Sequence, residues 1–309
     1  MNSIDNPIIF YPILIHIGFI AGFFGSMLGL GGGWLTVPAL QLFGVEPMTA
    51  VGTSLTAMIF NAATGTYKYY RKKILQLSLG LVLAGPALIG VYVGKNTLAM
   101  LAAAGQSEVV LQYAFIVLMV TLGIVMTISS RKKESKSLHK LPGKWAVLGP
   151  AVQINEQLRI GVLNTCVVGL TAGFLSGLLG IGGGIIMTPA LVFFFGISIV
   201  QAASASLVSV LISSLLGSSL YWYEGKAIFI YAIILAASTA AGSYLGSSLA
   251  PRMHEGVLKI IFACLAFLTA TALILTGTEH SILSVIILLV GTSILFLFAL
   301  QAKKKESLS

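Results

Sequence analysis

Long apolar segments separated by short polar loops cover almost the whole chain. Several reach the roughly 20 residues that a helix needs to cross a bilayer, and none shows the ~10-residue alternating segments of a membrane β-barrel. The apolar segments are approximately Ile8–Leu28, Trp34–Gly44, Pro47–Tyr70, Ile74–Asn96, Val109–Ser130, Gly161–Ile181, Ile185–Gly196, Ile199–Tyr223, Ile228–Leu249, Gly256–Thr276 and Ser281–Leu300. This pattern predicts an all-α polytopic membrane protein.

The apolar pattern is duplicated along the chain. GFFGSMLGLGGGWLTVPAL at Gly22–Leu40 returns as GFLSGLLGIGGGIIMTPAL at Gly173–Leu191, at a constant offset of 151 residues. Extended to Phe43 and Phe194, the two copies share 11 identities in 22 positions. Each copy interrupts apolar sequence with three successive glycines, which is typical of transporters built from two repeats with broken helices.

The repeat continues beyond this motif at an offset of 152. Tyr69 then matches Tyr221, and GVYVG at Gly90–Gly94 matches GSYLG at Gly242–Gly246. Each repeat therefore consists of a glycine-broken unit and three spans, and the matched tyrosines are expected in the interfacial aromatic belt. The predicted divisions are a first membrane repeat (1–130), a cytoplasmic linker (131–160), a second membrane repeat (161–278), and an extra span with a basic tail (279–309).

Composition agrees with the membrane assignment. The chain is 57% hydrophobic and 9% charged, whereas a soluble domain carries about 25% charged residues. The net charge of +9 does not indicate nucleic-acid binding, because the basic residues lie in short loops and report membrane orientation. The two cysteines, Cys166 and Cys264, lie in apolar segments and are expected to pack rather than to react or bind metal.

The distribution of basic residues predicts the topology. If each broken unit enters and leaves on the same side, 16 of the 18 Lys and Arg residues face the cytoplasm; if each crosses once, only 12 do. The positive-inside rule favours the first arrangement. It puts the N-terminus outside and the C-terminus in the cytoplasm. It also inverts the second repeat relative to the first, so that one hairpin enters from each side of the cytoplasmic membrane.

The glycine runs are the candidate binding site. Glycine permits positive φ and close backbone approach, and a short helix begins after each run. The first N–H groups of a helix lack intrahelical partners and its dipole places roughly half a positive charge there, so a helix N-terminus attracts anions. Two such N-termini meeting near the midplane would bind a small anion. Isolated glycines such as Gly80 and Gly123 are instead expected to serve helix packing.

Polar side chains beside the glycine runs extend this candidate site. The helices that follow carry matched polar stripes at i, i+3 and i+7, which share a face. Helix–helix hydrogen bonding is an equally good explanation of these stripes. The candidate substrate-binding residues are Gly31, Gly32, Gly33, Trp34, Thr36, Thr53, Ser54, Asn61, Gly182, Gly183, Gly184, Ile185, Thr188, Ser204, Ser206, Ser209 and Ser213. Thr36 and Thr188 are not aligned partners.

Enzyme chemistry finds no support in the sequence. There is no HExxH motif and no paired intramembrane carboxylate or nucleophile–base pair, so no catalytic residue, metal ligand or cofactor is expected. The nine acidic residues lie in loops or at span ends, His16 is the one ionisable side chain within a predicted span, and no Lys or Arg is expected at a span centre. The expected partners are a small anionic substrate and the lipid bilayer; the sequence does not predict an oligomeric state.

The doubled motif resembles that of the TauE/SafE sulfite exporter family of prokaryotic permeases. The pattern GxxxGxGGGxxxxPAL is approached at Ser26–Leu40 and Gly177–Leu191, and the resemblance covers essentially the whole chain. It implies transport of sulfur-containing anions such as sulfite or sulfonates, which agrees with an anion site. The expected function is thus a secondary transporter of an organosulfonate or sulfite; an anion channel lined by the same helix ends is the alternative.

Overall fold

The structure is a computed structural model that describes residues 7–131, 151–155, 158–276 and 281–306. Its helices are α1 (Pro7–Leu28), α2 (Gly33–Leu42), α3 (Pro47–Arg71), α4 (Leu77–Ala103), α5 (Ser107–Arg131), α6 (Val162–Leu179), α7 (Gly184–Phe195), α8 (Ile199–Tyr223), α9 (Phe229–Leu249), α10 (Glu255–Thr276) and α11 (Ser281–Glu306), with a short 3₁₀ turn η3 (Ala250–Arg252) after α9. Every predicted apolar segment is a helix, which confirms the all-α membrane architecture.

Most of these helices are suited to a bilayer. Within the described residues, α1, α4, α5, α8, α9, α10 and α11 are long and apolar enough to span a membrane. The helix α3 has 25 residues, but its polar stripe lowers its hydropathy below that of its counterpart α8. The helices α6 and α7 are apolar but shorter.

The helix α4 ends later than the sequence predicts. The helix α4 continues to Ala103 rather than ending at Asn96, so Lys95 lies two turns inside a helix and is 7% exposed. The interruption expected there is absent because the residues after Asn96 are again helix formers. Lys95, expected at the end of its span, thus lies further inside the helix, where it is paired as described below.

The linker between the repeats contains secondary structure that the sequence did not predict. Strands β1 (Ala151–Asn155) and β2 (Leu158–Gly161) pair antiparallel, with Ala151 opposite Gly161. The hairpin leads directly into α6. The surface segment around 145–148 lies outside the described residues.

The two repeats pack against each other with pseudo-two-fold symmetry. The helix α4 packs extensively on α6, and its counterpart α9 packs in the same way on α1. Likewise α3 packs on α9 as α8 packs on α4, while α3 contacts α8 and α5 contacts α10 across the pseudo-axis. Each repeat therefore has its first helix held by the other repeat, so neither half buries its own core alone.

Glycine pairs allow these helices to approach closely. A Cβ added at Gly90 or Gly94 on α4 would overlap backbone of α6, and one at Gly242 or Gly246 on α9 would overlap backbone of α1. Small residues four apart commonly allow such contacts in membranes. The matched motifs GVYVG and GSYLG thus form the equivalent contact in each half.

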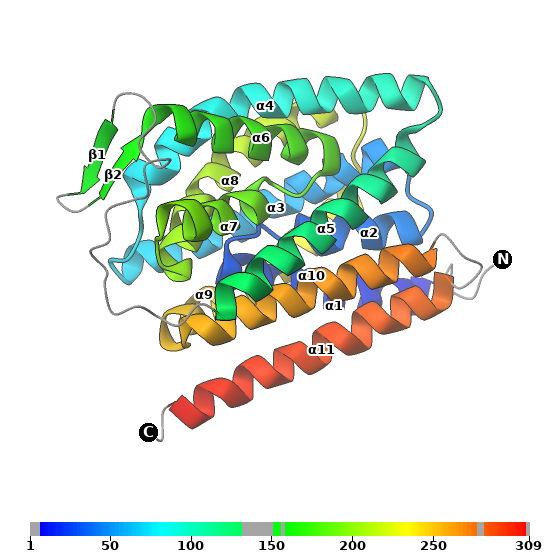
Figure 1. Ribbon diagram of the computed structural model, residues 1–309. Helices are drawn as coiled ribbons and strands as arrows, with labels where there is room; N and C mark the ends of the chain where they lie inside the picture. The colour runs from blue at the N-terminus through cyan, green and yellow to red at the C-terminus, as the bar shows by residue number, and fades with distance from the viewer. Residues whose placement is uncertain (1–6, 132–150, 156–157, 277–280, 307–309) are drawn as a thin grey trace.

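The start of α1 and the end of α11 lie at opposite ends of the bundle. Figure 1 shows the β1–β2 hairpin, the start of α6 and the end of α11 at the left of the molecule. The start of α1 lies at the right, and α11 crosses the length of the bundle along its lower edge. The linker hairpin and the end of α11 are therefore together, opposite the start of α1.

Two lysine side chains near the helix ends make contacts at pseudo-symmetric places, but their partners differ in chemistry. Lys95 of α4 is paired with Glu224, which follows α8. At the equivalent place, offset by 152 residues, Lys72 after α3 donates hydrogen bonds of 3.3 and 2.6 Å to the carbonyl oxygens of Ser247 and Ser248 on α9. Burial, followed by the charges of nearby Arg252 and Lys68, lowers the pKa of Lys72. One end of the bundle thus carries an ion pair between the repeats where the other has a lysine on carbonyl oxygens.

Candidate functional site

The glycine runs turn the chain back on itself at the end of α1 and of α6. Gly32 and Gly183 immediately precede α2 and α7, with φ values of +96° and +73°. These are left-handed conformations that glycine adopts without a steric cost. We call residues 29–33 and 180–184 tip 1 and tip 2. Both are buried.

The two tips touch through their backbones. A Cβ on Gly33 would overlap the carbonyl oxygen of Gly180, and a Cβ on Gly184 would overlap that of Gly29. Trp34 and Ile185, in the first turns of α2 and α7, are each 1% exposed. The structure thus brings the starts of α2 and α7 together in the protein interior. The N–H groups that begin the two helices, which a helix start leaves without an acceptor one turn back, therefore lie in one region.

Threonine–serine pairs tie each tip to the opposite repeat. The hydroxyls of Thr36 and Ser54 are 2.7 Å apart, and Ser54 donates to the carbonyl oxygen of Gly180 at 3.2 Å. On the other side, Thr188 donates to Ser206 at 3.1 Å, and Ser206 donates to the carbonyl oxygen of Gly29 at 2.8 Å.

The two threonines have equivalent partners although they are not aligned in sequence. Thr36 is three residues after Gly33, whereas Thr188 is four residues after Gly184. Positions three and four along a helix lie on the same face, so either spacing reaches the matching serine. The two half-sites are therefore alike in hydrogen bonding without being identical in sequence.

Several polar atoms at or near the tips are buried without a hydrogen-bond partner among the described residues. Asn61 donates from Nδ2 to the carbonyl oxygen of Gly31 at 2.6 Å, which leaves its Oδ1 unpaired. The indole Nε1 of Trp34 and the hydroxyl of Ser209 are also unpaired, and these residues are at most 1% exposed. Since a buried unpaired polar group costs about 1–3 kcal/mol, these atoms are candidate contacts for a ligand.

The remaining predicted side chains have other partners. Ser213 donates to the carbonyl oxygen of Val210 in its own helix. Thr53 accepts a hydrogen bond from the backbone N–H of Ile228, and Ser204 accepts one from that of Gln76. Ile228 and Gln76 immediately precede α9 and α4, so these two hydroxyls hold the starts of helices rather than the tips.

The sequence prediction misplaced one pair of residues near the tips and missed another pair. Tyr69 and Tyr221 are fully buried rather than interfacial, and donate to the carbonyl oxygens of Ser26 and Gly177 at 3.0 and 2.7 Å. Their matched positions could have indicated a shared internal role. Met58 and Val210, also matched at an offset of 152, fill the space between the tips. In the sequence, only their positions among the polar residues of α3 and α8 indicate that they face the tips.

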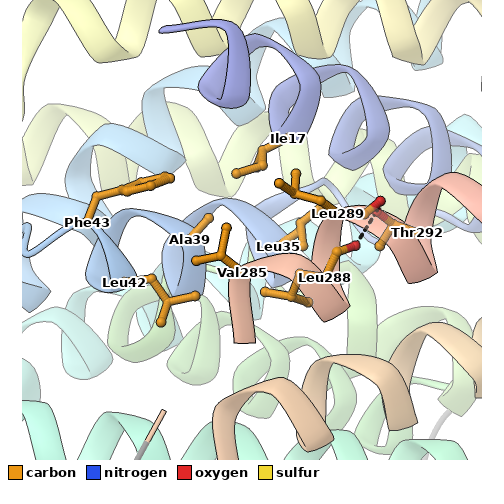
Figure 2. Close-up of a pocket in the computed structure, with 9 residues that line it drawn as sticks. All are labelled: Ile17, Leu35, Ala39, Leu42, Phe43, Val285, Leu288, Leu289 and Thr292. Atoms are coloured by element: carbon orange, nitrogen blue, oxygen red, sulfur yellow. Dashed lines mark hydrogen bonds between the residues drawn. The ribbon is translucent and has the colours of Figure 1, made fainter. Parts of the chain in front are cut away.

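A small cavity elsewhere does not suit an anion. It lies between α1, α2 and α11 and has a volume of about 10 Å³. Figure 2 shows its lining, which is apolar except for Thr292, and there the hydroxyl bonds to the carbonyl oxygen of Leu288. A volume of this size accommodates at most one water. The tips therefore remain the candidate site.

The comparisons agree with this architecture. The profile of the family described as sulfite exporter TauE/SafE matches residues 14–273. The chain belongs to the TauE/SafE sulfite exporter family. It is accordingly a multi-pass membrane transporter and not an enzyme, and both tips and all helices from α2 to α9 lie within the matched TauE/SafE region.

Curated TauE/SafE relatives are similar over most of the chain. The probable membrane transporter protein YunE of Bacillus subtilis is 30% identical over 281 residues, which cover 86% of this chain and 98% of YunE. YdhB of the same organism, also a probable membrane transporter protein, is 24% identical over 80% of this chain and 93% of YdhB. A shorter similarity joins it to the Arabidopsis thaliana sulfite exporter TauE/SafE family protein 3, at 34% over 30% of this chain and 20% of that protein. No solved structure matches the chain.

Proposed function

We propose that this chain is a secondary transporter that moves a small anion, an organosulfonate or sulfite, across the cytoplasmic membrane. The anion binds between the N-termini of α2 and α7. The observation that carries the proposal is the meeting of two helix starts in the interior beside the unpaired donors of Trp34 and Ser209. The printed family description, sulfite exporter, supports a sulfur-containing anion.

The site chemistry suits weak, reversible binding. Backbone N–H groups, an indole N–H and a hydroxyl donate hydrogen bonds without a fixed charge. Such donors suit the oxygen atoms around the sulfur of a sulfonate or of sulfite. A hydrogen bond to a charged group contributes about 1.5–3 kcal/mol. A few such bonds retain an anion without making its release slow. This is what a carrier requires.

An inverted arrangement of the repeats is part of the proposal. The N-terminus lies outside, the C-terminus lies in the cytoplasm, and the α1–α2 and α6–α7 hairpins enter from opposite sides. Figure 1 supports this arrangement, since the start of α1 lies opposite the linker hairpin and the end of α11. Whatever the orientation of the repeats, an inside-negative potential of 100 mV favours export of a monovalent anion by about 2.3 kcal/mol without a coupling ion.

The closed contact between the tips favours a carrier over an anion channel. A channel needs a continuous pore in its conducting state, whereas a carrier passes through states in which the site is closed. Electrical recording from the purified protein in a planar bilayer distinguishes the two. Unitary currents carried by sulfoacetate would support a channel, and anion uptake without resolvable currents would support the carrier.

The test of the site uses the unpaired donors. Purified protein is titrated calorimetrically with sulfite, sulfate, sulfoacetate, taurine and acetate to find the preferred anion. Trp34→Phe and Ser209→Ala should each weaken its binding by roughly tenfold or more, because each removes a donor to a charged ligand. Without anion, Ser209→Ala should unfold no more easily than the unaltered protein, because it also removes a buried unpaired group. Trp34→Phe removes such a group too, but it also leaves a cavity in the core that lowers stability.

Thr66→Val provides the matched control. The hydroxyl of Thr66 is likewise buried without a partner among the described residues, but Thr66 is not a member of the candidate site. This variant should keep the affinity of the unaltered protein. Normal anion affinity in both Trp34→Phe and Ser209→Ala, with each protein monodisperse, would place the binding site elsewhere.

A further inference from the structure

Two apolar side chains occupy the space between the tips. Added Cβ atoms at Gly31 and Gly182 would overlap the Met58 methyl group, and one at Gly33 would lie 2.9 Å from its sulfur. Val210 approaches from the other side, with its methyl carbons 3.0 to 3.1 Å from the Cβ positions of Gly31, Gly182 and Gly184. Both side chains are essentially inaccessible to solvent.

Met58 and Val210 interrupt the polar stripes at equivalent positions. On α3 the order is Ser54, Met58, Asn61, and these residues share one helical face at i, i+4 and i+7. On α8, Val210 lies between Ser206 and Ser213 in the same way. Methyl and thioether groups provide no hydrogen-bond donor, and burying an anion without donors is strongly unfavourable. In this structure the tips are thus closed to an anion.

The two halves of this apolar contact differ in mobility. Valine is β-branched and keeps one strongly preferred χ1 rotamer in a helix. Methionine is unbranched, has three rotatable side-chain bonds and adapts to irregular spaces. Of the two, Met58 therefore has the greater side-chain freedom.

We propose that Met58 is the movable gate of the anion site and that Val210 is its fixed wall. The role rests on the proposed function, since it names the residue that admits the anion to the tips. In the open state the Met58 side chain turns away and exposes the first N–H groups of α2 and α7. The space that it vacates sets the largest anion that can bind, so Met58 determines specificity by size.

Cysteine accessibility tests whether position 58 faces the path of the anion while position 210 stays covered by Met58. In a background with Cys166→Ala and Cys264→Ala, Met58→Cys is treated in proteoliposomes with methanethiosulfonate ethylsulfonate, a small anionic thiol reagent. The thiol at position 58 should react, and sulfoacetate should slow the reaction. Val210→Cys, the matched control on the fixed wall, should react at least tenfold more slowly. Absence of labelling at position 58, or equal labelling at both positions, would overturn the gate.

Transport selectivity tests the role in specificity. Met58→Ala removes most of the gate, so uptake of a bulky aromatic sulfonate relative to sulfoacetate should rise by roughly tenfold or more. Met58→Leu keeps a similar volume and should preserve the selectivity of the unaltered protein. An unchanged ratio in Met58→Ala would show that Met58 does not set the size limit. Failure of the proposed function is recognised separately, because the unaltered protein would then bind no anion in the titration, whereas the cysteine labelling reports on the gate in either case.

Discussion

At the scale of single residues, the tips combine satisfied and unsatisfied polar groups. Ser54 and Ser206 are already bonded to carbonyl oxygens of the opposite repeat, so they hold the tips together in the closed structure. Trp34 and Ser209 have unpaired donors. In the proposed site, stability and anion binding are therefore assigned to different neighbouring side chains, which substitutions can test separately.

The positive φ of Gly32 and Gly183 leads to a prediction about the tip backbone. Gly32→Ala and Gly183→Ala each force an L-residue into a left-handed conformation, at a cost of about 1–2 kcal/mol. The nearest atoms to the added Cβ would be Asn61 Nδ2 at 2.9 Å and Ala172 O at 2.8 Å respectively. Both variants should melt at lower temperature in detergent and lose affinity for the preferred anion, because the N–H groups that follow would be displaced.

Gly256→Ala is the control for this comparison. Gly256 is the second residue of α10, and an added Cβ there would meet nothing within 4 Å, so helix propensity should stabilise the variant by up to about 1 kcal/mol. Gly80 would be a poor control, because a Cβ there would lie 2.5 Å from the Val208 side chain and 2.7 Å from the Ala205 carbonyl oxygen. Wild-type anion affinity in both tip variants would show that the backbone N–H groups are not ligands.

Much of the candidate site was predictable residue by residue because glycine runs and polar stripes are sequence features. The contacts between repeats were not. The pairing of Ser54 with Gly180 depends on tertiary packing across 126 positions of sequence, and the different roles of Thr53 and Ser204 depend on which loop lies beside them. Met58 and Val210 look like ordinary apolar positions until the tips are seen on either side of them.

At the scale of helices, the hydrophobic pattern predicted that each helix exists but not where each one ends. The helix α4 continues past Lys95 because nothing after it breaks a helix, and the lysine is accommodated by Glu224 from the other repeat. The β1–β2 hairpin was missed because its short strands lie in a polar linker without a sustained alternation.

The Lys95–Glu224 pair provides a prediction at this scale. Glu224→Gln leaves a nearly buried ammonium without a counter-charge, which is destabilising. Because the Glu224 side chain is 36% exposed, solvent screening reduces the cost to about 1–2 kcal/mol. The midpoint of thermal unfolding in detergent should fall, while anion flux per folded molecule persists, because the pair lies at a helix end rather than at the tips.

Glu46→Gln is the matched control, since Glu46 pairs with Lys226 at 2.9 Å with side chains 49% and 35% exposed. An exposed pair of this kind contributes about 0–1 kcal/mol, so the unfolding midpoint should barely change. Equal destabilisation by Glu46→Gln and Glu224→Gln would contradict a special role for the buried lysine. Loss of flux in Glu224→Gln at normal expression would instead make this carboxylate part of the transport mechanism.

At the scale of the whole molecule, the interlocked packing explains why the two repeats occur in one chain. The helix α1 is held mainly by α9 and α6 mainly by α4, so each half completes the other. The same packing of each first helix on the other repeat brings tip 1 against tip 2. In the proposed transporter, the two tips are therefore two halves of one anion site.

The orientation of the repeats is tested by a matched pair of positions. Arg71 at the end of α3 and Tyr223 at the end of α8 are equivalent at an offset of 152, and both side chains are exposed. In the inverted arrangement they lie on opposite sides of the membrane, whereas a parallel repeat would put them on the same side.

With Cys166 and Cys264 replaced by Ala, Tyr223→Cys should react with a membrane-impermeant maleimide in intact cells. Arg71→Cys should react only after permeabilisation. Labelling of both in intact cells, or of neither, would rule out the inverted arrangement, and the opposite pattern would reverse the topology. The predicted pattern follows from the charges at these ends, since Lys68, Lys72 and Arg252 gather near Arg71, and such clusters remain on the cytoplasmic side.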